Sequence, residues 1–318
     1  MSFSINTNNV TIPEITNPNV SLGIGGNQIN KGNFSVAIGY QAGQFTQSVS
    51  SVSIGNQAGK YYEPSLIGVR AGNNVAIGNQ AGLSYQYQYS VSIGNQAGQL
   101  LNNACVAIGN QATQFTNGQF TVAIGNQAGQ NAQGGNTVAI GYQAGQNAQG
   151  GSGITIGYQA GQNTQGGSSV SIGNQAGQNT QGINSVAIGY QAGQNTQGIN
   201  SVAIGYQAGQ NIQATNSVSI GYQAGQNTQN QNAVAIGYQA GYTNQGSFSI
   251  ALGYQAGMTN QSQNSIVINT DPNGWGSDTT YQTTSGFFFK GLRGVAQGLG
   301  GPFLFYNTTT LEICYSTN

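Results

Sequence analysis

The side chains that usually carry out catalysis are almost absent from this chain. The sequence contains no histidine, and its few carboxylates are scattered along it, at Glu14, Glu63, Asp271, Asp278 and Glu312. General acid–base catalysis needs titratable groups held close together, and histidine is the commonest of them. The sequence therefore predicts a protein that is not an enzyme.

Sites for cofactors, metals and nucleic acids are equally poorly supported. Cys105 and Cys314 lie too far apart in the chain to indicate a disulfide framework. The 52 glycines form no GxxxxGK[ST] phosphate loop, and the repeats lack the aspartates of calcium-binding β-rolls. The five basic residues form no stripe that could neutralise phosphates, and no apolar run is long enough for membrane insertion. We expect no cofactor, no metal and no nucleic-acid partner.

Two irregular segments hold the residues best suited to contact a receptor or a glycan. The first combines charges with aromatic rings, and the second alternates tyrosines: Lys60, Tyr61, Tyr62, Glu63 and Arg70, then Tyr85, Tyr87 and Tyr89. Exposed tyrosines can stack on sugar rings. The alternative is structural: the first segment forms a kink or a subunit contact, and the second covers a turn of the fold.

These segments interrupt a repeat that must position them. An Ile-Gly pair, once Leu-Gly, recurs from Gly39 to Gly253, with a weaker copy at Ile24-Gly25. Every step from Gly109 to Gly253 is 16 residues long, whereas the two steps on either side of Gly68 are shorter. A fixed period of this size predicts a solenoid rather than a globular fold.

Each unit has the pattern of two short strands and two turns. In residues 201–205 (SVAIG), two large aliphatic residues alternate with small ones, as in a strand. We expect a second strand at 207–211 and a closing turn at 197–200. The valines and isoleucines are expected to point inward as an aliphatic ladder. The predicted fold is all-β: a parallel β-solenoid, in the form of a flattened β-roll with 16-residue coils.

Equivalent residues of successive coils should then lie above one another. The glutamines from Gln41 to Gln255 would form an amide ladder. A broken aromatic row is expected at Tyr142, Tyr158, Tyr190, Tyr206, Tyr222, Tyr238 and Tyr254.

The core of a single chain is expected to be thin, because each coil offers about two large aliphatic side chains against the entropy of ordering the whole coil. Another face should therefore be buried between chains. The small-residue face of the first strand, at positions such as Ser185 and Ala187, is the candidate. The sequence predicts a homo-oligomer, and specifically a trimer.

The unit N-S-V-A-I-G at 184–189 and 200–205, with S-V-S-I-G at 51–55 and 217–221, resembles the head repeat of YadA-type trimeric autotransporter adhesins. The resemblance covers about residues 35–269. It implies a left-handed parallel β-roll, three chains around a common axis, and a role in attachment to surfaces. The longer unit VAIGYQAGQNTQG is also similar to repeat proteins of giant DNA viruses and to tail or fibre proteins, which implies a virion-associated structural protein.

The ends of the chain depart from the repeat. Residues 1–34 are expected to cap or tether one end of the roll at 35–270, and residues 271–318 to form a terminal knob or subunit joint. The segments 303–306 and 311–315 predict a β-hairpin within this cap. The candidate residues for joining subunits head to tail are Trp275, Phe287, Phe288, Phe289, Phe303, Phe305 and Tyr306.

Three functions fit these features. The first is a structural fibre or filament protein on a virion surface or in an extracellular appendage. The second is an adhesin or receptor-binding module, with the rod as a spacer. The third is an ice-binding solenoid, for which only one interrupted threonine column is present, at Thr164, Thr180, Thr196 and Thr228. Because the first residues have neither a basic segment nor an apolar run, we expect no classical signal peptide.

Overall fold

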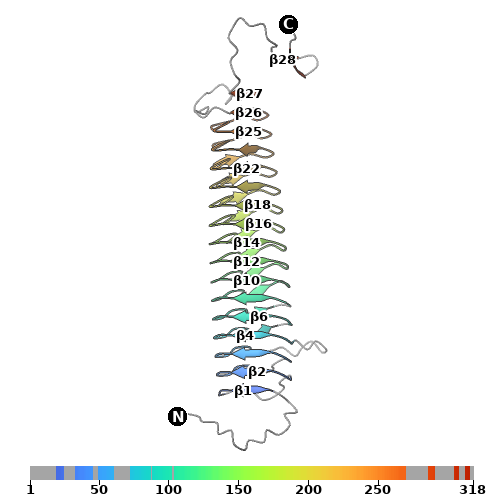
Figure 1. The fold of residues 1–318 in the computed structure, drawn as a ribbon, viewed down its shortest axis with the longest axis vertical. Helices are drawn as coiled ribbons and strands as arrows, with labels where there is room; N and C mark the ends of the chain where they lie inside the picture. The colour runs from blue at the N-terminus through green and yellow to red at the C-terminus, as the bar shows by residue number, and fades with distance from the viewer. Residues whose placement is uncertain are drawn as a thin grey trace, which may run out of the picture.

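The chain folds into a long, narrow stack of short β-strands (Figure 1). The computed structural model describes residues 19–24, 33–45, 49–60, 72–86, 88–101, 104–269, 286–290, 304–307 and 312–315. These residues form strands and turns, with no helix among them. The predicted all-β parallel solenoid is therefore confirmed.

One parallel sheet runs the length of the rod. Within the described ranges it holds 17 strands, and each strand pairs with the next along the chain. The strands are β1 (Val20–Leu22), β2 (Val36–Ile38), β3 (Val52–Ile54), β4 (Val75–Ile77), β6 (Val91–Ile93), β8 (Val106–Ile108), β10 (Val122–Ile124), β12 (Val138–Ile140), β14 (Ile154–Ile156), β16 (Val170–Ile172), β18 (Val186–Ile188), β20 (Val202–Ile204), β22 (Val218–Ile220), β24 (Val234–Ile236), β25 (Ile250–Gly253), β26 (Ile266–Asn269) and β27 (Phe287–Lys290).

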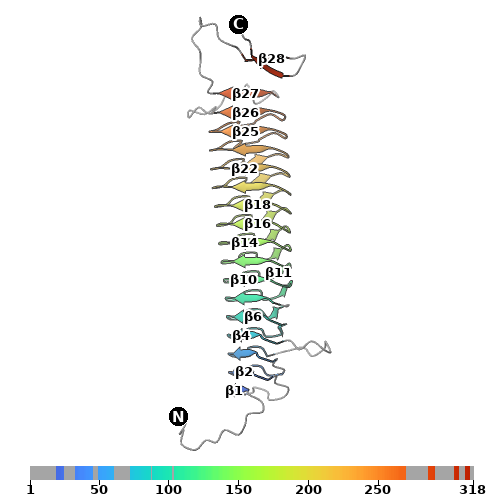
Figure 2. The same cartoon turned by 45° about the vertical axis from the view of Figure 1, so that its right-hand side comes forward.

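A second, narrower parallel sheet forms another side of the rod; its strand β11 is labelled in Figure 2. Its strands have two residues each: β9 (Thr116–Asn117), β11 (Ala132–Gln133), β13 (Ala148–Gln149), β15 (Thr164–Gln165), β17 (Thr180–Gln181), β19 (Thr196–Gln197), β21 (Ile212–Gln213) and β23 (Thr228–Gln229). A separate pair, β5 (Tyr85–Gln86) and β7 (Leu100–Leu101), is also parallel.

The pairing register carries each residue onto its equivalent in the next unit. Val186 pairs with Val202, and Ile188 pairs with Ile204. Equivalent side chains are 16 residues apart, as in the hydrogen bond from Gln207 to Gln191. The predicted 16-residue coil is confirmed, and each coil is one rung of a ladder.

Two expected rungs are placed differently. Strands β3 and β4 are direct neighbours, with Val52 paired to Val75, so the glycine at 68 does not mark a rung between them. At the start of the rod, Leu22 pairs with Ile38, which makes Gly23, not Gly25, the equivalent of Gly39. Both predictions were wrong because an Ile-Gly pair marks a rung only when the strand residues before it also match.

The turns depend on left-handed backbone conformations. Within one coil, Gly205, Gln207, Gly209 and Asn216 have φ angles of 131°, 53°, 53° and 59°. At Gly205 an added Cβ would lie 2.5 Å from the carbonyl oxygen of Gly221 in the next rung. Glycine is required there because any side chain would meet the backbone of the neighbouring coil.

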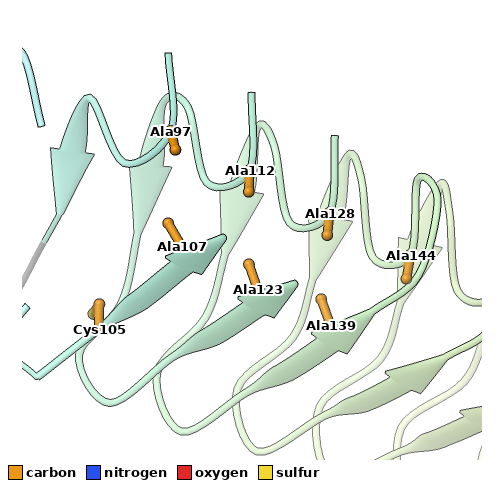
Figure 3. Close-up of a cluster of buried hydrophobic side chains, with 8 residues drawn as sticks. All are labelled: Ala97, Cys105, Ala107, Ala112, Ala123, Ala128, Ala139 and Ala144. Atoms are coloured by element: carbon orange, nitrogen blue, oxygen red, sulfur yellow. The ribbon is translucent and has the colours of Figure 1, made fainter. Parts of the chain in front are cut away.

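The interior of the rod is lined by alanine and serine. Ser201, Ala203 and Ala208 are fully buried, whereas Val202 and Ile204 of the same strand alternate with them and are only partly buried. Figure 3 shows alanines from the two sides of successive coils pointing toward one another. The predicted internal ladder of valine and isoleucine is therefore wrong, because these residues face outward.

The reason is the small space that one coil encloses. A Cβ added to Gly209 would be 3.4 Å from the Cβ of Ala203, so two branched aliphatic side chains per rung have no room inside. The expectation that Ser185 and Ala187 contact a sister chain is wrong for the same reason. Both side chains are fully buried within their own chain.

Glutamine fills the rest of the interior from the second sheet. Gln213 is fully buried, and its Nε2 donates to the carbonyl oxygens of Val202 at 2.8 Å and Ser217 at 3.4 Å. This second strand lies at Ile212–Gln213, not at the predicted 207–211, where the chain turns. A buried amide can bridge the two sides of the coil through backbone acceptors, which alanine cannot do.

The parallel sheet continues past residue 270, because Ile266 of β26 pairs with Phe287 of β27. Further along, β28 (Leu304–Asn307) and β29 (Glu312–Tyr315) pair antiparallel. The two segments expected to form a hairpin are therefore paired as antiparallel strands.

Candidate functional site

The outward side chains of the long sheet form a continuous apolar surface. We call this surface the Val–Ile stripe: the first and third residues of each strand from β2 to β25. All of them are half-buried or exposed within one chain. Its members are aliphatic on every rung, and the sequence contains no charged residue between Arg70 and Asp271. A surface of this length and composition can bind another apolar surface.

A ladder of glutamine amides follows one corner of the rod. Each Nε2 donates to the Oε1 of the previous rung, from Gln57 to Gln41 at 3.0 Å up to Gln255 to Gln239 at 3.0 Å. The links between them are also present, so the predicted amide ladder is confirmed. These bonds join every rung to its neighbour and contribute stiffness along the axis.

The corner position directly after the Ile-Gly pair carries a second ladder, which changes chemistry along the rod. In its N-terminal part asparagines are hydrogen-bonded, as from Asn126 to Asn110 at 3.3 Å. In its C-terminal part tyrosine rings are stacked 5.0–5.3 Å apart, as for Tyr190 and Tyr206. Asn174 interrupts the stack. The predicted broken row of tyrosines is confirmed.

The residues expected to contact a partner are only partly described. Lys60 is half-buried, and its carbonyl oxygen accepts a hydrogen bond from the amide of Phe45 at 3.2 Å. Tyr85 lies in β5, and Tyr89 is exposed in the turn before β6. The remaining candidates lie outside the described residues: Tyr61, Tyr62, Glu63, Arg70 and Tyr87.

The residues expected to join subunits are also divided. Phe287, Phe288 and Phe289 belong to β27, where Phe287 is exposed and Phe288 packs against the interior cluster that contains Val267. Phe305 and Tyr306 belong to β28. Trp275 and Phe303 lie outside the described residues.

Sequence reasoning named Tyr89 but missed the set of exposed residues to which it belongs. Four aromatic side chains occupy the left-handed corner that precedes the long sheet, a position at which most units carry asparagine or serine: Phe34, Tyr89, Phe120 and Phe248. The signal was available, because each of these residues lies two positions before the first aliphatic residue of its unit.

The described residues offer extended surfaces for contact. Across the described ranges, no three Cys, Asp or Glu side chains gather as a metal site would require. No helix in the same ranges has the length and apolarity to cross a bilayer. Cys105 is buried, and its thiol donates to the carbonyl oxygen of Gly118 at 3.4 Å.

Comparison with known families gives one match. Residues 181–208 match the model of the YadA head domain repeat, in two copies. No curated protein and no solved structure matches the chain. The repeats are therefore similar to YadA head repeats, as expected. Together with the solenoid, they fit a structural protein of the fibre or adhesin kind.

Proposed function

We propose that this chain is the shaft of a homo-oligomeric fibre, in which parallel copies bury their Val–Ile stripes against one another. The observation that carries the proposal is the outward position of Val202, Ile204 and their equivalents on every rung. Branched aliphatic side chains repeated along a whole face are stabilised by leaving water. An isolated rod cannot bury them, but a second copy with the same rung spacing can cover each one.

Three copies is the number that the likeness to YadA-type heads favours, since such heads form trimers. The lack of charge from residue 71 to residue 270 removes the repulsion that would oppose association of identical rods. The fibre would stand on a virion surface or in an extracellular appendage. The terminal rungs β1 and β27 would allow head-to-tail stacking of shafts.

Association is tested by placing charge on the stripe. Val170→Asp with Val202→Asp adds two carboxylates on alternate rungs of the long sheet. The matched control, Thr164→Asp with Thr196→Asp, adds the same charge on the second sheet. Light scattering should give an oligomer for the wild type and the control, and a folded monomer for the stripe variant. A wild-type protein that is monomeric at micromolar concentration would contradict the proposal.

A second candidate is an adhesin in which the rod spaces a binding segment from its support. The exposed ring of Tyr89, and the likeness to adhesin heads, favour it. Replacing residues 60–70 by a regular unit, or Tyr89→Asn, should then abolish binding on a glycan array. Ice binding is supported less, because Ile212 interrupts the exposed threonine column of the second sheet.

A further inference from the structure

Four aromatic residues adopt a backbone conformation that bulky side chains avoid. Phe34, Tyr89, Phe120 and Phe248 have φ angles of 62°, 59°, 58° and 58°. Their side chains are 65%, 62%, 58% and 56% exposed. The same corner in the other rungs holds smaller residues: Ser50, Asn73, Ala104, Asn136, Ser152, Ser168, Asn184, Asn200, Asn216, Asn232 and Asn264.

In an isolated chain, an aromatic residue at this corner is unfavourable in two ways. The left-handed conformation strains a bulky residue more than it strains asparagine. The ring is also exposed to water, whereas asparagine joins a ladder of amides, as from Asn184 to Asn200 at 3.3 Å. A strained conformation that is retained at an exposed site indicates a function for the aromatic side chain that asparagine could not perform.

The four residues lie beside the proposed interface. Each one precedes by two residues the first member of the Val–Ile stripe on its rung, as Phe120 precedes Val122 and Phe248 precedes Ile250. A ring at this corner can therefore extend the apolar surface at the edge of the stripe. The occupant that fits is another copy of this chain, because the sequence from residue 71 to residue 270, which holds Tyr89, Phe120 and Phe248, carries no charge to attract a charged partner.

A periodic stripe creates a problem that these residues can solve. Two identical rods that slide past each other by one whole rung regain almost every aliphatic contact, so the stripe alone does not define an axial register. The aromatic corners are spaced unevenly. From β2 to β6 there are three rungs, from β6 to β10 two, and from β10 to β25 eight.

The four residues define six pairwise intervals, counted in rungs. Three are the intervals between neighbours and three are sums of those, and no two of the six are equal. A shift by any number of rungs therefore brings at most one aromatic corner level with another. The unshifted parallel alignment brings all four level. In that alignment every ring stands at the same rung as its equivalent in the sister chain, where contact between the two chains can cover its exposed apolar surface.

We propose that Phe34, Tyr89, Phe120 and Phe248 set the axial register between parallel copies of this chain. This inference rests on the proposed self-association and adds how the copies are aligned. It also accounts for aromatic residues at a corner where the backbone favours asparagine.

The test measures register directly in the full chain. A nitroxide label is attached to Thr196→Cys on the exposed face of the second sheet, in a background of Cys105→Ser and Cys314→Ser. Pulsed electron paramagnetic resonance then measures distances between labels on different chains. With the aromatic residues present, we expect one narrow distance distribution. With Phe34→Asn, Tyr89→Asn, Phe120→Asn and Phe248→Asn combined, we expect most label pairs to move to several longer distances.

The control removes the same number of rings from a regular ladder, through Tyr190→Asn, Tyr206→Asn, Tyr222→Asn and Tyr238→Asn. Asparagine already occupies that corner at Asn174, so the control should fold and keep one narrow distribution. Replacing any single one of the four aromatic residues should also leave one narrow distance distribution, because the three residues that remain still define three different intervals.

An unchanged narrow distribution in the fourfold aromatic variant would overturn the register proposal while leaving self-association intact. Absence of any interchain distance in the labelled protein with its aromatic residues would overturn both proposals. Circular dichroism of each variant establishes that the rod itself is folded.

Discussion

The hydroxyl of Ser171 donates a 2.7 Å hydrogen bond to Oε1 of Gln181 in the interior of the rod. Ser219 and Gln229 repeat this relationship at 2.7 Å. Where the strand carries alanine instead, the glutamine oxygen can lack a donor, as at Gln197 Oε1. Opposite serine the hydroxyl satisfies this buried oxygen. Opposite alanine the oxygen either accepts from the glutamine of a neighbouring rung, as Gln245 Oε1 does from Gln229 Nε2 at 3.0 Å, or has no donor.

Ala187→Ser should stabilise the rod by about 1 kcal/mol, because the new hydroxyl lies where Ser171 lies in the previous rung and can donate to Gln197 Oε1. The reverse change, Ser171→Ala, should destabilise by about 1–3 kcal/mol by leaving Gln181 Oε1 without a donor. Thermal unfolding followed by circular dichroism measures both. Equal midpoints for the two variants would contradict the assignment.

Ala203→Leu should destabilise the rod by about 1–3 kcal/mol, because the interior around Ala203 has no room for a larger side chain. Thr196→Leu adds the same residue on the exposed column that already holds Ile212, and should change stability little. Denaturant unfolding of the two variants compares an inward with an outward position. A tolerated leucine at 203 would mean that valine and isoleucine line the interior after all.

Asn174→Tyr should join the tyrosine stack that ends at Tyr158 to the one that begins at Tyr190. Two new ring pairs would add about 1–3 kcal/mol in total. Tyr222→Asn removes two ring pairs, at 5.1 Å on either side, and should lower the unfolding midpoint. Near-ultraviolet circular dichroism should gain intensity in the first variant and lose it in the second. No change in either signal would show that the rings do not stack in solution.

The unfolding midpoint of the rod should differ by less than about 2 °C between pH 4 and pH 8 at constant ionic strength. Stability varies with pH only where folding changes the number of bound protons, and the sequence has no Asp, Glu or His from residue 71 to residue 270. Calorimetry at the two pH values measures the shift. A midpoint that rises steeply with pH would mean that carboxylates near the ends stabilise the whole stack.

The repeat allowed the fold and its ladders to be predicted, but it did not reveal which face is inside. Alternation in Val202, Ala203 and Ile204 shows which residues share a face, whatever the direction of that face. Hydrophobicity favoured the larger residues for the interior, whereas at these positions of the long sheet the narrow coil encloses the small residue, as at Ala203. The restriction of the middle strand position to Ala, Ser or Thr in most units was the available sign of enclosure.

The buried glutamines were missed because an amide is normally exposed, and only its backbone acceptors make burial favourable. Gln213 needs the carbonyl oxygens of Val202 and Ser217, which come together only in the closed coil. The aromatic corners other than Tyr89 were missed for a different reason. A left-handed φ at Phe248 is a property of the backbone, which the sequence indicates only after the turn has been located.

The vertical pairing of like with like has a consequence for how such a gene can change. Because Val186 and Val202 stand in equivalent surroundings, removing the unit between them brings Val186 onto Val218 with the same neighbours above and below. Recombination between near-identical coding segments can therefore shorten or lengthen the shaft in whole units without creating a single unfamiliar contact. The length of the shaft can therefore be inherited and can vary without changing how the chain folds.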